Sequence, residues 1–450
     1  MRNAVITIIL MLSFSVKSAE VNTEDLTSLT MHPDSIDQFV KDLQVAISNH
    51  PTFLAAEASV AQSSQLVSIA KSARRPQLSL QTSTTNRLSS SFDNNSNFFE
   101  SSPISERTSA SVVIRQLLFD SFATSHDVKQ QKNTLLADQL RKDQQVASLA
   151  LKMINNCLDT ASYYLLKNLV SESVLRHNQI TEQIKVRVES GRAAMREFTR
   201  ASARLAEAQA KELNADLNYK SSLAEFRELM PDVAVCKRML YLDASDLILD
   251  KELAVDLALK FNLSIQESDK RIKASEENLL KIKANRWPKL NLTLQGDKYN
   301  SEVYMTKNLD DYDYYAGINF DMNLYSGGRK RSEIKTAQAQ LSEVRFKKAE
   351  LVKNITANTV SLLTELENAD QRVDIFKRAF LANDKSRENL RLQFVSSNVS
   401  LLELLQAERD YLESSENMIF NQRSVLLAGF TELALLGRLL SFIKERNSAN

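Results

Sequence analysis

Few residues in this sequence have the types and spacing that catalysis or metal binding requires. The histidines lie far apart, without the short spacings of metal ligands: His32, His50, His126 and His177. Ser68 and Lys71 have the Ser-x-x-Lys spacing of a catalytic motif, but no partner motif follows, so chance explains it better. No glycine-rich phosphate-binding loop is present. The sequence therefore predicts no enzyme, no metal site and no cofactor.

One carboxylate has a clear local role. Ser400-Leu401-Leu402-Glu403 has the spacing of a capping box, in which the serine caps a helix and the glutamate reaches back to the helix start. The two cysteines leave two interpretations open. Cys157 and Cys236 could form a disulfide in an oxidising compartment, or remain two unpaired small apolar residues.

The N-terminus has the parts of an export signal. Arg2 is followed by an apolar run over residues 4–16, and Ser18 and Ala19 offer small residues for cleavage. The run is too short for a membrane anchor, which needs about 20 apolar residues. Residues 1–19 are therefore predicted to be a signal peptide. No later stretch is apolar enough for a transmembrane helix, so the exported chain is either soluble or spans a membrane through β-strands.

Composition excludes disorder and a nucleic-acid partner. Of the 450 residues, 43% are hydrophobic and 25% are charged, as in folded proteins, and the net charge is only +1.

Glycine and proline are missing from two long stretches. Between Pro103 and Pro231 the only residue of either type is Gly191, and between Gly328 and Gly429 there is none. Both stretches predict very long helices, and the second should run unbroken from residue 329 to about 396. Its apolar residues recur every 3, 4 or 7 positions, from Ile334, Ala337 and Leu341 to Leu366 and Val373. Such a seam indicates coiled-coil packing.

Other segments alternate between apolar and polar residues, as strands with one apolar face do. Residues 290–295 show this pattern, and so do residues 317–324. Tyrosines cluster nearby, which suits a membrane–water interface but also a small soluble sheet: Tyr299, Tyr304, Tyr312, Tyr314 and Tyr315.

The chain is duplicated. Corresponding segments are offset by 212 positions at the first strand of each copy and by 206 from the second strand onward: 74–80 with 286–292, 118–121 with 324–327, and 197–201 with 403–407. The change in offset places hairpin loops at 92–104 and 303–311, because loops tolerate insertions and packed helices do not. Repeat 1 is predicted over 36–232, with strands near 76–90 and 107–120, and a linker over 233–250. Repeat 2 covers 251–442, with strands near 288–301 and 312–326.

Four strands cannot close a barrel, so a membrane-spanning form needs several chains. Three chains would supply twelve strands.

These features resemble the TolC-like outer-membrane efflux and secretion proteins over roughly residues 40–440. The resemblance rests on the His50-Pro51 start, two Arg-x-Pro-x-Leu-x-Leu segments, and the segments 116–120, 324–328 and 435–439. It implies a mainly α fold: a long helical coiled-coil barrel, with four strands per chain closing a 12-stranded barrel in a homotrimer. It also implies an outer-membrane location with a long periplasmic extension. The implied partners are outer-membrane lipid, a periplasmic adaptor (membrane fusion) protein and an inner-membrane transporter of ABC or RND type.

The resemblance also implies a role for acids after the two helix turns, which face the narrow tunnel end in the family. The matching residues are Glu197 and Glu403, and three-fold symmetry would turn Glu403 into a ring of three carboxylates that favours cations. The capping role of Glu403 stands beside this one. Family members often have a second acidic residue one turn later. That position holds Gln406 in the second repeat and Arg200 in the first, which predicts weaker cation selectivity.

Family gates use a tyrosine and an arginine beside these acids. Here Phe394 and Val399 occupy those positions, so the usual gate bonds cannot all form. The first turn carries four arginines: Arg187, Arg192, Arg196 and Arg200. We hypothesise that one of them pairs with Glu403 or Glu197 and holds the tip closed. The alternative is that all four lie on a solvated face. Gly191 should permit the first turn through a positive φ, and Ser397 takes its place in the second.

The predicted function is a passive exit duct of a tripartite secretion or efflux system, gated at its helical tip. The turn over 393–403 favours a type I secretion partner, with drug efflux as the alternative. A soluble periplasmic coiled-coil adaptor is the competing class, and an exported enzyme is a third. Extraction separates the first two, because a channel needs detergent and an unanchored adaptor does not.

Overall fold

The computed structural model describes residues 29–31, 33–87, 105–243, 246–248, 250–303, 306–395 and 399–448. The predicted signal peptide, 1–19, lies outside them. The chain forms four strands and a set of mostly long helices, in this order: α2 (Pro33–Asn49), α3 (Pro51–Ser72), β1 (Gln77–Arg87), β2 (Ser105–Phe119), α4 (Ala123–Glu189), α5 (Met195–Leu229), α6 (Lys251–Phe261), α7 (Leu263–Ala284), β3 (Lys289–Val303), β4 (Thr306–Asp321), α8 (Arg329–Glu367), α9 (Ala369–Val395), α10 (Leu401–Leu435) and α11 (Leu439–Ser448).

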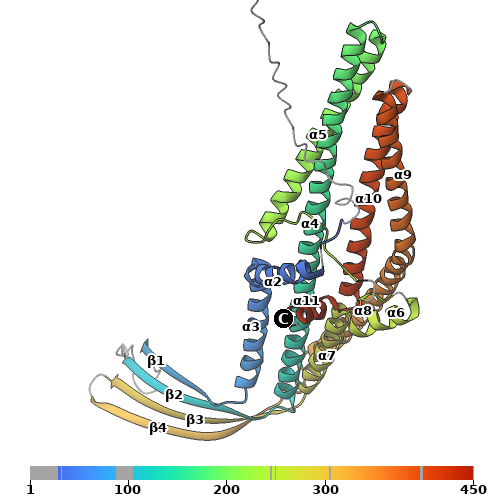
Figure 1. Ribbon diagram of the computed structural model, residues 1–450. Helices are drawn as coiled ribbons and strands as arrows, with labels where there is room; N and C mark the ends of the chain where they lie inside the picture. Colours follow the sequence, from blue (N-terminus) through green and yellow to red (C-terminus); the bar gives the residue numbers. More distant parts are fainter. Residues whose placement is uncertain are drawn as a thin grey trace, which may run out of the picture.

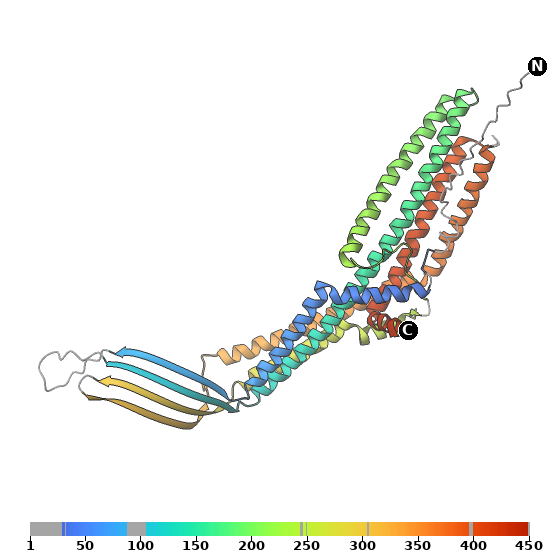
Figure 2. The ribbon, with the colours of Figure 1, turned by 60° about the vertical axis from the view of Figure 1, so that its left-hand side comes forward.

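The molecule is elongated, with the sheet at one end and the two helix turns at the other (Figures 1 and 2). Its longest element, α4, has 67 residues and therefore extends about 100 Å. The first half of the chain runs α3, β1, β2, α4 and α5, and the second half runs α7, β3, β4, α8, α9 and α10. The two halves of the chain thus repeat the same order: a helix, two strands and then long helices.

The long helix of the second half is broken, which corrects the expectation of one helix from 329 to about 396. The helix α8 ends at Glu367 and α9 begins at Ala369. Between them, the side-chain amide of Asn368 donates a hydrogen bond of 3.2 Å to the Thr364 carbonyl. In a continuous helix, the backbone N–H of Asn368 would donate to this carbonyl. The backbone N–H donates to Leu366 instead. The Asn368 side chain therefore competes with the helical hydrogen bond and ends α8.

The four strands form one antiparallel sheet in the order β1-β2-β3-β4. The two halves meet in its middle, where Ile114 of β2 pairs with Leu294 of β3. The outer strands, β1 and β4, have no further neighbour among the described residues. The sheet therefore has two unpaired edges.

The strand limits differ from those expected. The first loop, 92–104, lies outside the described residues. The second loop was expected over 303–311, but residues 306–311 belong to β4, where Leu309 pairs with Ser301. That loop was placed from changes in length alone, whereas pairing with β3 extends β4 closer to the hairpin end. At its other end β4 stops at Asp321 rather than 326, since the chain turns there toward α8.

Polar contacts join the helices beside the sheet. Asp138 of α4 is buried and accepts hydrogen bonds from Ser63 of α3 and from Arg271 of α7, the latter at 2.9 Å. His126 of α4 lies 2.7 Å from Glu277 of α7. Both contacts between α4 and α7 connect the first half of the chain with the second.

The main hydrophobic core lies in the middle of the molecule, where α2, α11 and the segment after α5 pack around α4 and α10. This core contains a disulfide between Cys157 of α4 and Cys236, with Cα atoms 5.4 Å apart. Both sulfur-bearing residues are fully buried. The disulfide interpretation of the two cysteines therefore holds.

Across the described ranges, no single helix has the length and apolar character needed to cross a membrane. Only α10 and α11 taken together pass that criterion, and they meet at an angle of 104°.

Candidate functional site at the helix turns

Both helix turns lie at the end of the molecule farthest from the sheet (Figure 2). The first turn connects α4 to α5, and Gly191 has a φ of +72° there, which favours glycine. The Arg187 carbonyl accepts hydrogen bonds from the backbone N–H groups of Arg192 and Ala193, at 2.7 and 3.1 Å. The turn is therefore closed by backbone bonds. Ser397, in the second turn, lies outside the described residues.

A small apolar core ties the two turns together. Phe394, which occupies the family's tyrosine position, is only 2% exposed and packs in this core. The other members come from the helices on either side of both turns: Ile180, Ile184, Ala201, Leu401, Leu404 and Leu405. Phe394 therefore joins the two helical hairpins through apolar contacts.

Arg187 makes a polar contact between the two hairpins close to their turns. Its guanidinium donates a hydrogen bond of 2.8 Å to the Phe394 carbonyl and lies 4.5 Å from the centre of the Phe394 ring. Arg187 is one of the four arginines considered in the sequence, but its partner here is a carbonyl and an aromatic ring. The contact bonds the end of α4 to the end of α9 without a carboxylate.

The other tip residues lie on the surface. Arg196 and Arg200 are exposed, and Glu197 is half-buried in the first turn of α5. Within the described part of this single chain, no ion pair joins either arginine to Glu197 or Glu403. Pairing of these residues across subunits stays a prediction.

Glu403 lies in the first turn of α10 and is exposed. Ser400 caps this helix, because its side-chain oxygen accepts the Glu403 N–H at 3.3 Å. In the described structure the Glu403 carboxylate makes no return bond to the Ser400 N–H, so only half of the capping box forms. The carboxylate therefore stays exposed beside the second helix turn.

A second acidic residue, Asp410, lies beside Gln406 at this site. The side-chain amide of Gln406 donates a hydrogen bond of 2.7 Å to Asp410, one turn farther along α10. Glu403, Gln406 and Asp410 line a groove of about 490 Å³ whose opposite wall is formed by α9. Sequence reasoning missed Asp410 because the expected position was one turn earlier.

A charged cluster farther from the tip was also missed. Arg176 of α4 forms a 2.9 Å ion pair with Glu408 of α10 and a 3.2 Å pair with Glu172. Arg387 of α9 lies over the Tyr411 ring at 3.9 Å. Burial lowers the pKa of Arg176, but the carboxylates outweigh this effect and raise it. The signal was in the sequence: Glu408 lies on the apolar seam of α10, where an acid needs a partner.

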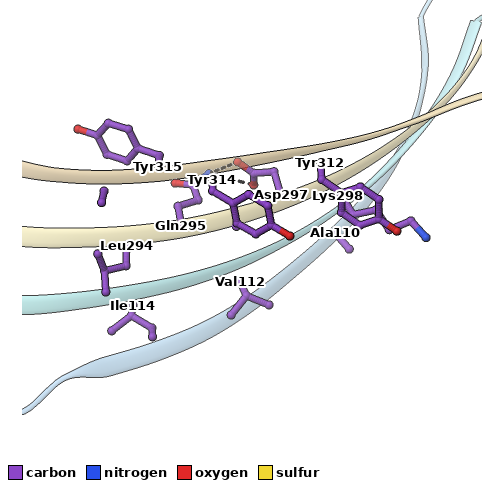
Figure 3. Close-up of a pocket in the computed structure, with 12 residues that line it drawn as sticks. Ala110, Val112, Ile114, Leu294, Gln295, Asp297, Lys298, Tyr312, Tyr314 and Tyr315 are labelled. Carbon is purple, nitrogen blue, oxygen red and sulfur yellow. Dashed lines mark hydrogen bonds between the residues drawn. The ribbon is translucent and has the colours of Figure 1, made fainter.

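The sheet presents a second candidate surface. The even-numbered residues of β3 and β4 share one face with those of β1 and β2, and this face is mostly apolar. Figure 3 shows Tyr314 over this face near Val112 and Leu294, and Tyr312 farther along it, next to Lys298. Tyr314 is 79% exposed, and Leu78 of β1 is 72% exposed. Such exposure of aromatic and aliphatic side chains across a whole sheet indicates a surface that contacts a membrane or another protein chain.

An amphipathic four-stranded sheet on paired long helices is the fold of solved outer-membrane channels. The structure resembles that of CmeC from Campylobacter jejuni, with a TM-score of 0.76, 14% identity and coverage of 92% of this chain and 89% of that chain. It also resembles VceC from Vibrio cholerae, with a TM-score of 0.74, 15% identity and coverage of 89% and 96%.

Residues 43–230 and 254–437 match the model of the family described as outer membrane efflux protein. The chain therefore belongs to this family. A curated relative is the outer membrane protein TolC of Salmonella enteritidis, which is 22% identical over 337 residues, or 70% of this chain. The match spans 66% of that relative's length, just under two thirds. The resemblance to the TolC family is thus confirmed, while the type I secretion subtype is not distinguished.

Proposed function

We propose that this chain is one of three identical subunits of an outer-membrane exit channel. The observation that carries this proposal is the sheet, which has one apolar face and two unpaired edges, β1 and β4. Unpaired edge groups are not tolerated in lipid, since no water is present to bond them. Pairing β4 of one subunit with β1 of the next removes both edges, and three subunits close a twelve-stranded barrel.

The helices would form the periplasmic tunnel of this channel. The helices α3, α4, α7 and α8 follow the strands in the same lateral order, so closure of the sheet also brings α8 of one subunit beside α3 of the next. Exposed apolar residues remain on these two helices, including Ile69 of α3 and Phe346 of α8. Contact between subunits would cover them.

The tip would then serve as gate and docking site. Three-fold symmetry converts Glu403 into a ring of three carboxylates, with Glu197 on the adjacent hairpin, and such a ring favours cations. The groove along α9 and α10 that contains Gln406 and Asp410 is a site for the periplasmic adaptor. Energy for export comes from the inner-membrane transporter, and the channel only opens and closes. The turn sequence favours a type I secretion system over a drug-efflux pump.

The native mass of protein extracted with detergent from isolated outer membranes tests the proposal. A mass of three chains supports barrel closure between subunits. A monomer in the soluble periplasmic fraction would exclude the channel and favour the coiled-coil adaptor.

A further inference from the structure

A groove of about 1070 Å³ lies where α7 enters β3 and where β4 leads into α8. We call it the junction groove. Its apolar part contains Trp287, Leu324 and Tyr325, which are 62%, 87% and 84% exposed. Its polar part contains five cationic side chains and no carboxylate: Lys283, Arg286, Lys330, Arg331 and Lys335.

The positive charge of the groove is not neutralised inside the chain. Lys330 donates a hydrogen bond of 3.2 Å to the Asn323 carbonyl, which carries no full charge. Within the described residues, none of the five cations has an ion pair. The first turn of α8 also opens into the groove at Gly328, and its N-cap residue supplies no side-chain acceptor. The helix dipole therefore adds to the positive potential.

The internal duplication supplies a comparison for this groove. The position equivalent to Ser326 in the first repeat is Asp120, whose carboxylate accepts the Thr124 N–H at 2.6 Å at the start of α4. The first repeat therefore places its own anion at the helix start. The second repeat lacks that carboxylate and carries Lys330 and Arg331 where the first has Thr124 and Ser125. The start of α8 thus has added cations but no carboxylate at the position that Asp120 occupies at the start of α4.

We propose that the junction groove binds the phosphate headgroup of an anionic phospholipid. This inference rests on the proposed function, which places the sheet in the bilayer and the groove at the periplasmic headgroup layer. Exposed tryptophan and tyrosine next to lysine and arginine are typical of that layer. The cations take the phosphate, while Trp287 and Leu324 contact the upper acyl chain.

Lipid binding to the full-length protein in a neutral detergent tests this site. Native mass spectrometry would measure the affinity for phosphatidylglycerol and for phosphatidylcholine. We expect a preference for phosphatidylglycerol that falls about thirtyfold in Arg331→Gln/Lys335→Gln, since two surface cations are lost. The control Lys353→Gln/Lys377→Gln removes equal charge from exposed positions elsewhere on α8 and α9 and should leave the preference unchanged.

A second variant separates loss of charge from loss of fold. Ser326→Asp places the carboxylate of the first repeat in the groove, keeps all five cations, and should weaken phosphatidylglycerol binding to a similar degree. Equal affinity in wild type and both groove variants would overturn the proposal. The proposal would also be overturned if phosphatidylcholine bound as well as phosphatidylglycerol and inorganic phosphate competed fully with the lipid.

Two further outcomes concern what covers the groove. If the groove variants dissociate the oligomer without changing lipid affinity, a second copy of the chain occupies the groove and the lipid proposal fails. Membrane fractionation tests the proposed function separately, because the lipid measurement is made in detergent. Phosphatidylglycerol binding by a protein absent from the outer membrane would refute the channel and leave the groove as an anion site.

Discussion

Arg176 of α4 and Glu408 of α10 form an ion pair, 2.9 Å long, that joins the two halves of the chain. Glu408 is only 1% exposed, and Arg176 also pairs with Glu172 and lies 5.4 Å from the Tyr411 ring. In a channel that opens by separating its helical hairpins, this contact would have to break or move with them. In the proposed channel, the pair would therefore affect both stability and gating.

Glu408→Gln should lower the free energy of unfolding by about 3 kcal/mol, because Arg176 would lose a buried partner. Thermal denaturation of the detergent-extracted protein would measure this loss, and planar-bilayer recording would show more frequent opening. Glu413→Gln is the matched control, since Glu413 is exposed on the same helix. Equal melting temperatures for the two variants would contradict a role for the pair.

Arg187→Gln should open the tip. The variant loses a charged hydrogen bond to the Phe394 carbonyl and a cation–π contact with its ring, together worth about 2 kcal/mol. The ratio of open to closed tips would rise by about thirtyfold. Single-channel conductance would measure the change, with Lys185→Gln as a control from the exposed side of α4.

The same recording tests the hypothesis of pairing between subunits. Arg196→Gln or Arg200→Gln should also raise conductance if either residue pairs with Glu403 or Glu197 across the three-fold axis. Unchanged conductance in both variants would leave tip closure to Arg187.

Local patterns in the sequence predicted most of the elements but not their ends. The long helices followed from missing glycine and proline, and the strands from alternating side chains, because both signals lie within one segment. The break at Asn368 depends on one side-chain hydrogen bond to Thr364, which spacing does not show. The extent of β4 depends on pairing with β3, which is a contact between segments.

The tip was predicted less completely for the same reason. Glu197 and Glu403 could be found because they follow the helix turns directly. Whether Arg187 meets Phe394, 207 positions away, depends on how two hairpins pack against each other. A buried acid such as Glu408 can be suspected from its position on an apolar seam, but its partner, Arg176, is fixed only by the fold.

Glu403→Gln should reduce the cation preference of the channel, since it removes three carboxylates from the narrow end. The reversal potential in a salt gradient would move toward zero. Glu197→Gln should have a smaller effect, because Glu197 is half-buried and Glu403 is exposed. An unchanged reversal potential in both variants would mean that these acids do not line the conducting path.

Cys236→Ser should destabilise the central core. The disulfide to Cys157 spans 79 positions, and loss of a cross-link that closes a loop of that size costs about 4.5 kcal/mol in the chain-entropy model. The variant should melt at a lower temperature than the wild type, and reductant should lower only the wild-type value. If reductant leaves the wild type unchanged, the bond contributes little to stability.

Glu432 of α10 should make stability depend on pH. Burial raises its pKa to about 7, although the Ile248 N–H, at 3.1 Å, and the charge of Arg438 favour the ionised form. In the unfolded chain the carboxyl ionises near its usual value of about 4.3. Between these values only the folded protein keeps the proton, so stability falls as pH rises through this window and levels off above about 7.

The shift corresponds to about 4 kcal/mol across that window. Glu432→Gln keeps an acceptor for the Ile248 N–H but removes the titration, so its melting temperature should change little between pH 5 and pH 8. Wild type and the exposed control Glu413→Gln should both lose stability over this range. A wild-type melting temperature that rises with pH would show that Glu432 is ionised in the folded protein and that another contact compensates its burial.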